Sequence, residues 1–337
     1  MQIRNPTLFD IAALPLVGPK GRTLFTVILK GTFALGTGEP SDEQMLIAYA
    51  DELRDDTGAV RYESDIVPFK PRTDIALWAA AYAPDAQPAA SVRVSVKVGP
   101  VEKPLMVFGE RYWNHTGLLR RDYRITEAKP FVRQPIVYEA AFGGIDMLSG
   151  AYCSENLMGC GFYDAKAKQN LVGKPLPCIE DPRHLIRSIT DHPRPVGYGF
   201  YHRAWQPRAA FAGTYDETWR KQHCPLPPED FDARFYNGAH PDLQVGGYLR
   251  GDEPVILTHL TPDGLAHFTL PGIAPICSIA RQNEKGRLEE KQGQMHLDTL
   301  FIEPDDERYC IVWRTTFPIQ SVPEEEIERV AILIDKW

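Results

Sequence analysis

The sequence predicts a mainly β protein with antiparallel, sandwich or barrel-like sheets, a few short helices and long packed loops rich in Pro and Gly. In Ser91–Gly99, valines alternate with polar residues, the pattern of a strand with one buried face. Other short apolar runs recur between Gly and Pro turns, and 29 prolines in 337 residues disfavour a helical bundle. We expect the following side chains in the core: Val92, Val94, Val96 and Val98. We expect Arg93 and Lys97 to face water.

The first third of the chain contains several further strand patterns. Thr23–Leu35 is rich in β-branched and aromatic residues and predicts one long strand bent at Gly31, or a strand pair. Gln44–Ala50 is short and apolar, and its neighbours favour a strand there as well. Asp74–Ala83 and Lys103–Glu110 predict strands on either side of Ser91–Gly99.

The middle of the chain is punctuated by Gly and Pro every few residues from about 126 to 200. This composition predicts short strands and packed loops, because a structureless loop of that length is rare inside a domain. Asp181–Ser188 predicts a helical turn or two. Thr214–Cys224 predicts a short helix capped by Thr214 or Asp216, with Trp219 on its buried face. Asp230–Gly238 predicts a second one, capped by Asp230.

The final third returns to β patterns. Val255–Leu270 predicts a hairpin around the turn formers Pro262, Asp263 and Gly264. Asn283–Gln294 is highly polar and predicts an exposed loop. The remaining segments predict a hairpin over His296–Phe317 and a last strand over Arg329–Ile334. We divide the chain into residues 1–125, a sandwich-like domain, and 126–337, a mostly β domain. No linker marks this boundary, so a single unit also fits.

Composition excludes several classes of protein. A formal net charge of −8 argues against nucleic acid as a partner, because phosphate binding needs clustered Lys and Arg. The N-terminus lacks a signal-peptide pattern, and no run approaches the ~18 apolar residues of a membrane span. We therefore expect a cytoplasmic protein. The six cysteines show no C-x-x-C pair, which favours free, mostly buried thiols.

We find no motif for catalysis or cofactor binding, and we expect neither a cofactor nor a metal. The nucleophile elbow, the P-loop and the H-E-x-x-H pattern are all missing from the sequence. Cys224 beside His223 fits a buried thiol next to a surface His better than a nucleophile and base. The acidic groups at 180–181 and 229–232 fit caps and turns better than paired catalytic carboxylates. Five histidines form a loose group without metal-ligand spacing, namely His184, His192, His202, His223 and His240.

The aromatic stretch Trp205–Leu249 is the centre of the functional prediction. It interleaves large aromatic residues with Pro, Gly and acidic residues, so it predicts an irregular connector rather than one helix. Such a connector is either a plug of the core, which composition favours, or a recognition surface for a protein partner. The candidate partner-binding residues are Trp205, Tyr215, Asp216, Trp219 and Phe231.

The same stretch carries a resemblance to a known family. Residues 213–244, GTYDETWRKQHCPLPPEDFDARFYNGAHPDLQ, resemble the centre of the bacterial family catalogued as domain of unknown function 2169. Six flanking segments agree in the same order: SDIVPFKPRTD (64–74), FGERYW (108–113), VYEAAFGG (137–144), LPCIEDPRHLI (176–186), RPVGYGFYHRAWQPR (194–208) and HLDTLFIEPDDERYCIVWR (296–314). The resemblance implies a non-enzymatic adaptor or chaperone that binds a type VI secretion effector and helps to load it onto the secretion spike.

Two other functions stay open. A hydrolase-like enzyme would need a cleft where Asp216, Arg208 and His202 or His223 converge. A structural component of the secretion machine would form stable homo-oligomers. The sequence identifies neither the effector nor the oligomeric state.

Overall fold

The computed structural model describes residues 1–54, 58–116, 122–167, 169–282, 287–319 and 327–334. Within these ranges the regular structure is mainly β, with one α-helix, α1 (Glu217–Gln222), and eight short 3-10 turns. No helix in this part of the chain has the length and apolar character of a membrane span. The predicted fold class is confirmed: the sheets are largely antiparallel and open.

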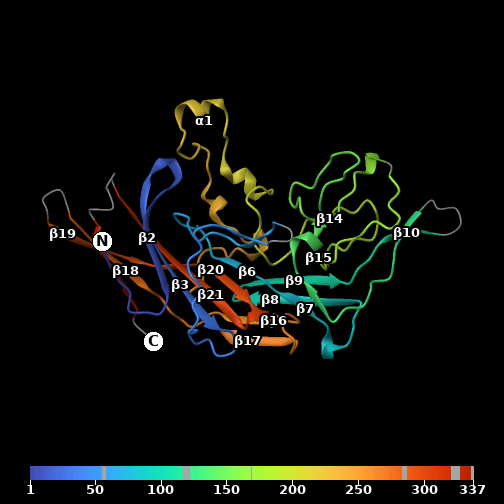
Figure 1. Cartoon of the computed structure of the whole chain (residues 1–337), viewed down its shortest axis with the longest axis horizontal. Coiled ribbons are helices and arrows are strands. Elements are labelled where there is room, and N and C mark those ends of the chain that lie inside the picture. Colours follow the sequence, from blue (N-terminus) through green and yellow to red (C-terminus); the bar gives the residue numbers. More distant parts are fainter. Residues whose placement is uncertain (55–57, 117–121, 168, 283–286, 320–326, 335–337) are drawn as a thin grey trace.

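The first five-stranded sheet has the strand order β2-β3-β21-β20-β6 (Figure 1). Its strands are β2 (Asp10–Val17), β3 (Thr23–Ala34), β21 (Arg308–Pro318), β20 (His296–Glu303) and β6 (Asp74–Leu77). The long strand and the C-terminal hairpin that the sequence predicts are thus confirmed as β3 and β20–β21, whereas β2 has no predicted counterpart. All pairs are antiparallel except β6 with β20.

The second five-stranded sheet is antiparallel, in the order β15-β9-β8-β16-β17. Its strands are β15 (Ile179–Glu180), β9 (Val101–Phe108), β8 (Ser91–Val98), β16 (Pro254–Thr258) and β17 (Leu265–Thr269). The predicted alternation is confirmed on β8: its four valines are buried, and Arg93 and Lys97 are exposed. The hairpin predicted over Val255–Leu270 is β16–β17.

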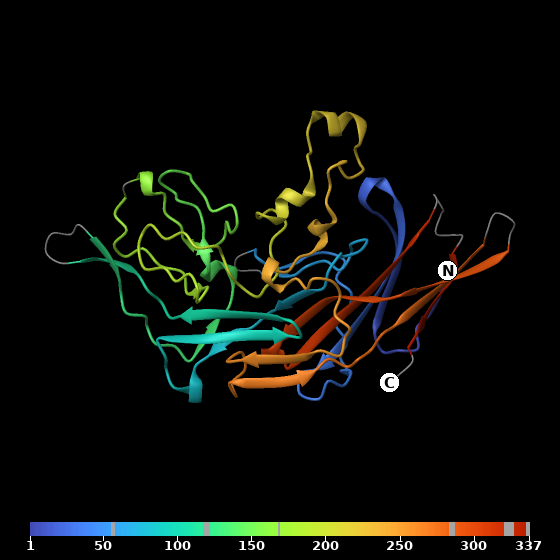
Figure 2. The same cartoon turned by 180° about the vertical axis from the view of Figure 1, so that it is seen from behind.

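A four-stranded sheet brings the two chain ends together at one side of the molecule (Figures 1 and 2). Its order is β1 (Gln2–Arg4), β22 (Ile327–Leu333), β18 (Ile276–Gln282) and β19 (Leu288–Gln294), with β1 parallel to β22. The loop predicted over Asn283–Gln294 is therefore wrong from Leu288 onward, and residues 283–286 lie outside the described ranges. β19 is polar because it is an exposed edge strand, where charged side chains discourage further pairing.

Four two-stranded sheets complete the β structure. They pair β4 (Glu52–Leu53) with β5 (Val60–Tyr62), β7 (Ala80–Tyr82) with β12 (Arg133–Pro135), β10 (Trp113–Thr116) with β11 (Asp122–Ile125), and β13 (Phe142–Gly143) with β14 (Cys160–Gly161). The strand pattern of Asp74–Ala83 is thus two short strands, β6 and β7.

Both five-stranded sheets contribute to one hydrophobic core. From the first sheet, Phe25 and Leu29 of β3 are fully covered; from the second, Val94 of β8 and Val255 of β16 are covered in the same cluster. Each of these sheets combines strands from before and after residue 125. The division at that residue stays a prediction.

The outer face of β3 is covered by an irregular segment and not by another strand. The strand predicted over Gln44–Ala50 is wrong: the side-chain amide of Gln44 accepts from Thr32 N at 2.8 Å and donates to Thr32 O at 3.0 Å. The Gln44 side chain and the Ser41 N–H, which donates to Thr32 O at 2.9 Å, thereby satisfy the edge that a neighbouring strand would have filled.

Residues 64–67 lie beside this segment, where Ala48 N donates to Asp65, and buried ion pairs and hydrogen bonds fix them to the sheet. Lys30 of β3 donates to Asp65 at 3.1 Å, and Arg314 of β21 donates to Asp298 at 2.5 Å and to the carbonyls of Asp65 and Val67. Buried charges need such partners, because an unpaired buried charge costs several kcal/mol. The polar residues of this segment therefore have a structural role.

Two predicted helical segments differ from expectation. Asp181–Ser188 forms only a turn, with Asp181 accepting from Arg183 N at 2.9 Å. Asp230–Gly238 contains a 3-10 turn over Ala233–Tyr236 whose cap is Asp232, not Asp230. Both segments are short, and their acidic residues bond within a turn instead of starting a longer helix.

Candidate functional site

The five candidate residues are divided between the core and a projecting arm. Trp205 is only 3% exposed and packs edge to face against Tyr138 and Tyr201, with ring centroids 5.3 Å apart in both pairs. The core-plug interpretation therefore holds for Trp205. The other four residues lie on residues 213–231, here called the arm, which stands out from the sheets at the top of Figure 1.

Local bonds give the arm a defined shape. Asp216 caps α1 by accepting from Trp219 N at 2.8 Å, which confirms one of the two predicted caps. The Trp219 indole N–H donates to Leu226 O at 2.8 Å, so this side chain links α1 to the irregular segment that follows it in the arm. Tyr215 meets the Trp219 ring edge to face at 4.6 Å and is 55% exposed. Trp219 itself is half-buried, and the body of the protein leaves α1 uncovered.

The arm closes at its base and leans on a neighbouring hairpin. Asp230 accepts from Thr214 N and Thr214 Oγ1 at 2.9 and 2.8 Å, joining the two ends of the arm. Phe231 is half-buried and packs against Phe235 and Tyr236. A Cβ on Gly21 would crowd Leu226 Cδ1 at 2.9 Å, so the arm contacts the turn between β2 and β3.

A buried cation anchors the base of the arm to the body. Arg208 donates to Glu63 at 2.6 Å and to the carbonyls of Tyr201 and Phe235 at 2.7 and 2.9 Å. A Cβ on Gly238 would collide with the Glu63 carboxylate, which explains the glycine there. These bonds fix the residues on either side of the arm to the body of the protein.

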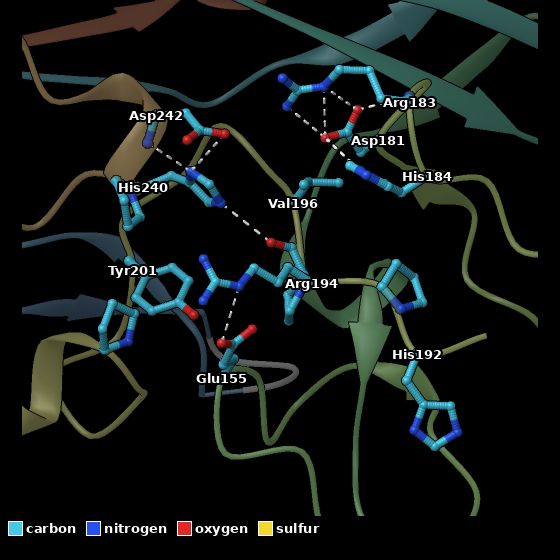
Figure 3. Close-up of a pocket in the computed structure, with 14 residues that line it drawn as sticks. Glu155, Asp181, Arg183, His184, His192, Arg194, Val196, Tyr201, His240 and Asp242 are labelled. Atoms are coloured by element: carbon cyan, nitrogen blue, oxygen red, sulfur yellow. Dashed lines mark hydrogen bonds and ion pairs between the residues drawn. The ribbon is translucent and has the colours of Figure 1, made fainter. Parts of the chain in front are cut away.

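A pocket of about 420 Å³ lies beside the arm base (Figure 3). Its walls come from three separate stretches, 181–184, 192–196 and 240–242, together with Glu155, Tyr201 and Pro207. In Figure 3, Asp181, Arg183 and His184 lie on one side, and His240 and Asp242 lie on the other. None of the five candidate residues lines this pocket, so sequence reasoning missed it.

His240 is held neutral at the pocket wall. Burial, followed by the Lys103 charge, lowers the pKa of His240 far below its ordinary value of 6.5. Its Nδ1 accepts from Asp242 N at 3.1 Å and lies 3.3 Å from Lys103 Nζ, so its Nε2–H donates to Pro195 O at 3.2 Å. Both ring nitrogens are thus occupied, which leaves neither to act as a base near neutral pH.

The acids of the pocket are paired with cations. The Arg183 guanidinium lowers the pKa of Asp181 to about 2, and Arg183 Nη2 lies 2.7 Å from Asp181 Oδ2. Burial would raise the pKa of Asp242, but the bond from Lys103 at 2.8 Å outweighs it and the pKa is lowered. A hydrolytic site typically contains carboxylates in a deep pocket whose pKa is strongly shifted. Here the shifts favour the charged form and follow from ion pairs.

The groups named for catalysis are engaged elsewhere. Arg208 binds Glu63, and Asp216 caps α1. Cys224 is exposed, so the buried thiol expected there is wrong; all six cysteines are free as expected, but only two are fully buried. Of the five histidines, the pocket brings together His184, His192 and His240. The described residues contain no group of three or more His, Cys, Asp or Glu side chains placed so that they could hold a metal ion.

Comparison with protein families gives one match. The model of a bacterial family described as "Uncharacterized protein conserved in bacteria (DUF2169)" covers residues 20–314. The chain belongs to this family. The match spans the arm, the pocket and the second five-stranded sheet; of the first sheet it covers β3, β6, β20 and the start of β21, whereas β2 precedes it. No curated protein and no solved structure matches the chain.

Proposed function

We propose that the protein is a cytoplasmic adaptor that binds a type VI secretion effector and helps to load it onto the secretion spike, without enzymatic turnover. The likeness of its sequence segments to the DUF2169 family suggests this role. The observation that carries it is the arm. An adaptor needs aromatic anchors that are rigid and open to a partner, since a few such residues dominate most protein interfaces.

The arm meets both requirements. Tyr215 is exposed and lies against Trp219, whose indole is fixed by its bond to Leu226 O. Leu226 adds a partly exposed apolar side chain on the same arm. Because Asp216 and Asp230 fix the arm through backbone bonds, little side-chain or loop entropy is lost on binding.

The direct test requires a toxin gene next to the gene of this protein; the product of such a gene, here called the neighbouring toxin, should form a complex with the protein. Purified protein and the neighbouring toxin should co-elute on gel filtration. A strain that lacks the gene of the adaptor should still fire its secretion system but fail to deliver that toxin. Unchanged delivery of every effector in the deletion strain would reject the proposal.

A pair of tyrosine variants locates the contact. Tyr215→Ala should weaken the complex, because it removes an exposed anchor, whereas Tyr49→Ala should leave it unchanged. Tyr49 is also exposed but lies on the segment that covers β3. Equal affinity of both variants, measured by isothermal titration calorimetry, would move the contact away from the arm.

A further inference from the structure

A strip of basic side chains lies along the pocket and along a second depression next to it. Five exposed residues make up this basic strip: Arg183, His184, Arg187, His192 and Arg194. Three of the five are arginines, in a chain whose net charge is −8. The acid between them, Asp191, is used internally: its carboxylate accepts from the backbone N–H groups of Arg187 and Ser188, both at 2.8 Å.

Buried groups hold the loop that carries the basic strip. Glu180 is buried, pairs with Arg111 and accepts from Ile186 N at 2.8 Å. Ile186 is itself part of a small core cluster. Asp181 bonds both the backbone and the side chain of Arg183. The basic groups are therefore displayed on a fixed backbone.

The basic strip borders two adjoining hollows. The pocket of about 420 Å³ and a shallower depression of about 530 Å³ share Arg183, His184, His192 and Pro193. Arg194 is 85% exposed and makes only a 3.6 Å ion pair with Glu155. Figure 3 shows it between the two walls of the pocket. Its guanidinium has most of its donors free to bind an acceptor from outside.

We propose that the basic strip docks an acidic peptide segment of a protein partner, with carboxylates of that segment pairing with Arg187 and Arg194. Charge complementarity identifies the partner's chemistry, since Arg forms bidentate bonds with carboxylates. The facing wall supplies Tyr201, Pro207 and the free oxygen of Asp242, which suit a peptide chain that brings its own N–H donors. This inference rests on the proposed function and names the kind of effector segment recognised.

The pocket favours a peptide over nucleic acid. A phosphodiester backbone has no N–H donor to offer Glu155 and Asp242 on the pocket walls, whereas a peptide backbone has one at every residue except proline. An acidic peptide alternates carboxylates with amide donors, so it can pair with the basic strip and also donate to these acids. An oligonucleotide is therefore the appropriate competing probe.

The test uses the full chain and a fluorescein-labelled peptide of twelve residues in which Glu alternates with Gly. In fluorescence anisotropy the wild-type protein should bind this peptide, and binding should weaken as salt rises, because exposed charges are screened. Arg187→Glu with Arg194→Glu should weaken binding by at least about tenfold, since two attractive pairs become repulsive. Arg93→Glu on the exposed face of β8 is the matched control and should bind as the wild type does.

The opposite results are equally clear. Unchanged peptide binding in the double variant, equal binding of an alternating Lys–Gly peptide, or tighter binding of a single-stranded oligonucleotide would overturn the inference. If the double variant is unstable, the single variant Arg194→Gln takes its place. It should melt at the same temperature as the wild type and should also bind the peptide more weakly.

Gel filtration with the neighbouring toxin separates this inference from the proposed function. If the toxin binds the wild type and the double variant equally well, the basic strip is not its docking surface although the adaptor role stands. If the acidic peptide binds through the basic strip but the toxin does not bind at all, the strip stands and the adaptor role fails.

Discussion

Trp205 and Trp219 belong to one aromatic stretch, yet their surroundings assign them opposite roles. Trp205 is enclosed by Tyr138 and Tyr201, whereas Trp219 stands on the arm with Tyr215. The difference follows from what surrounds each ring. A tryptophan inside the core contributes buried area to folding, and one on an exposed support offers that area to a partner.

This difference predicts unequal effects on stability. Trp205→Ala should lower the free energy of unfolding by about 3–5 kcal/mol, the range for a large aromatic side chain cut to Ala in a core. Trp219→Ala should cost clearly less, because its ring is half-buried, and the protein should still unfold cooperatively. Urea denaturation followed by fluorescence measures both. A larger loss for Trp219→Ala would show that the arm is part of the core.

His240 predicts a dependence of stability on pH. In the unfolded chain this histidine takes up a proton near pH 6.5, but in the folded protein its pKa is far lower. Its contribution to stability is therefore complete above pH 6.5 and is lost as the pH falls toward the folded pKa. The slope from one such group reaches about 1.4 kcal/mol per pH unit.

The measurement compares wild type and His240→Gln between pH 7 and pH 5.5, above the range where carboxylates titrate. His202, whose pKa burial also lowers, contributes a slope to both proteins equally. The variant should show a shallower decline. Identical slopes would mean that His240 is protonated in the folded state.

At the scale of elements, β8 is a central strand with one buried face. It pairs with β9 and β16, and its valines point into the common core. Val94→Asp should cost several kcal/mol, because it buries a carboxylate without a partner. Arg93→Ser should cost well under ~1 kcal/mol, as surface changes usually do. Equal melting temperatures would contradict the assignment of the two faces.

The arm is an element that the body of the fold can do without. Its ends meet at the Thr214–Asp230 bonds, and its base is held separately by Arg208. Replacing residues 216–228 with a short Gly-Ser linker should therefore leave the melt cooperative while abolishing binding of the neighbouring toxin. Differential scanning calorimetry checks the fold. Collapse of the melt would show that the contact of Leu226 with the β2–β3 turn is needed for folding.

At the scale of the whole molecule, each five-stranded sheet is held together by strand pairs that combine one strand from before residue 125 with one from after it. β3 needs β21, β6 needs β20, and β8 needs β16, and all three partners come from the second half of the chain. A fragment of residues 1–125 should therefore lack cooperative unfolding, because it leaves three strand edges and their core faces uncovered. A sharp thermal transition of the isolated fragment would support two separate domains instead.

Local patterns in the sequence predicted those elements in which apolar residues and turn formers recur at a regular spacing. The alternation on β8, the long apolar strand β3 and the turn formers between β16 and β17 each carry their structure in neighbouring residues. The cap of α1 behaves in the same way: Asp216 acts on a backbone group three residues away. Such signals are local, so the sequence alone contains them.

Only the tertiary structure decided the functional surfaces. The Gln44 side chain takes the place of a strand because the backbone groups of Thr32 have no strand partner on that side of β3. Similarly, residues 288–294 form β19 because β18 lies beside them, which no local pattern encodes. The pocket joins residues 181–184 with 240–242, and His240 is neutral because it is buried and because Lys103 lies next to it. Exposure of Tyr215 and burial of Trp205 depend on packing by distant segments. Pairing, burial and charge are set by neighbours in space, and the fold chooses those neighbours.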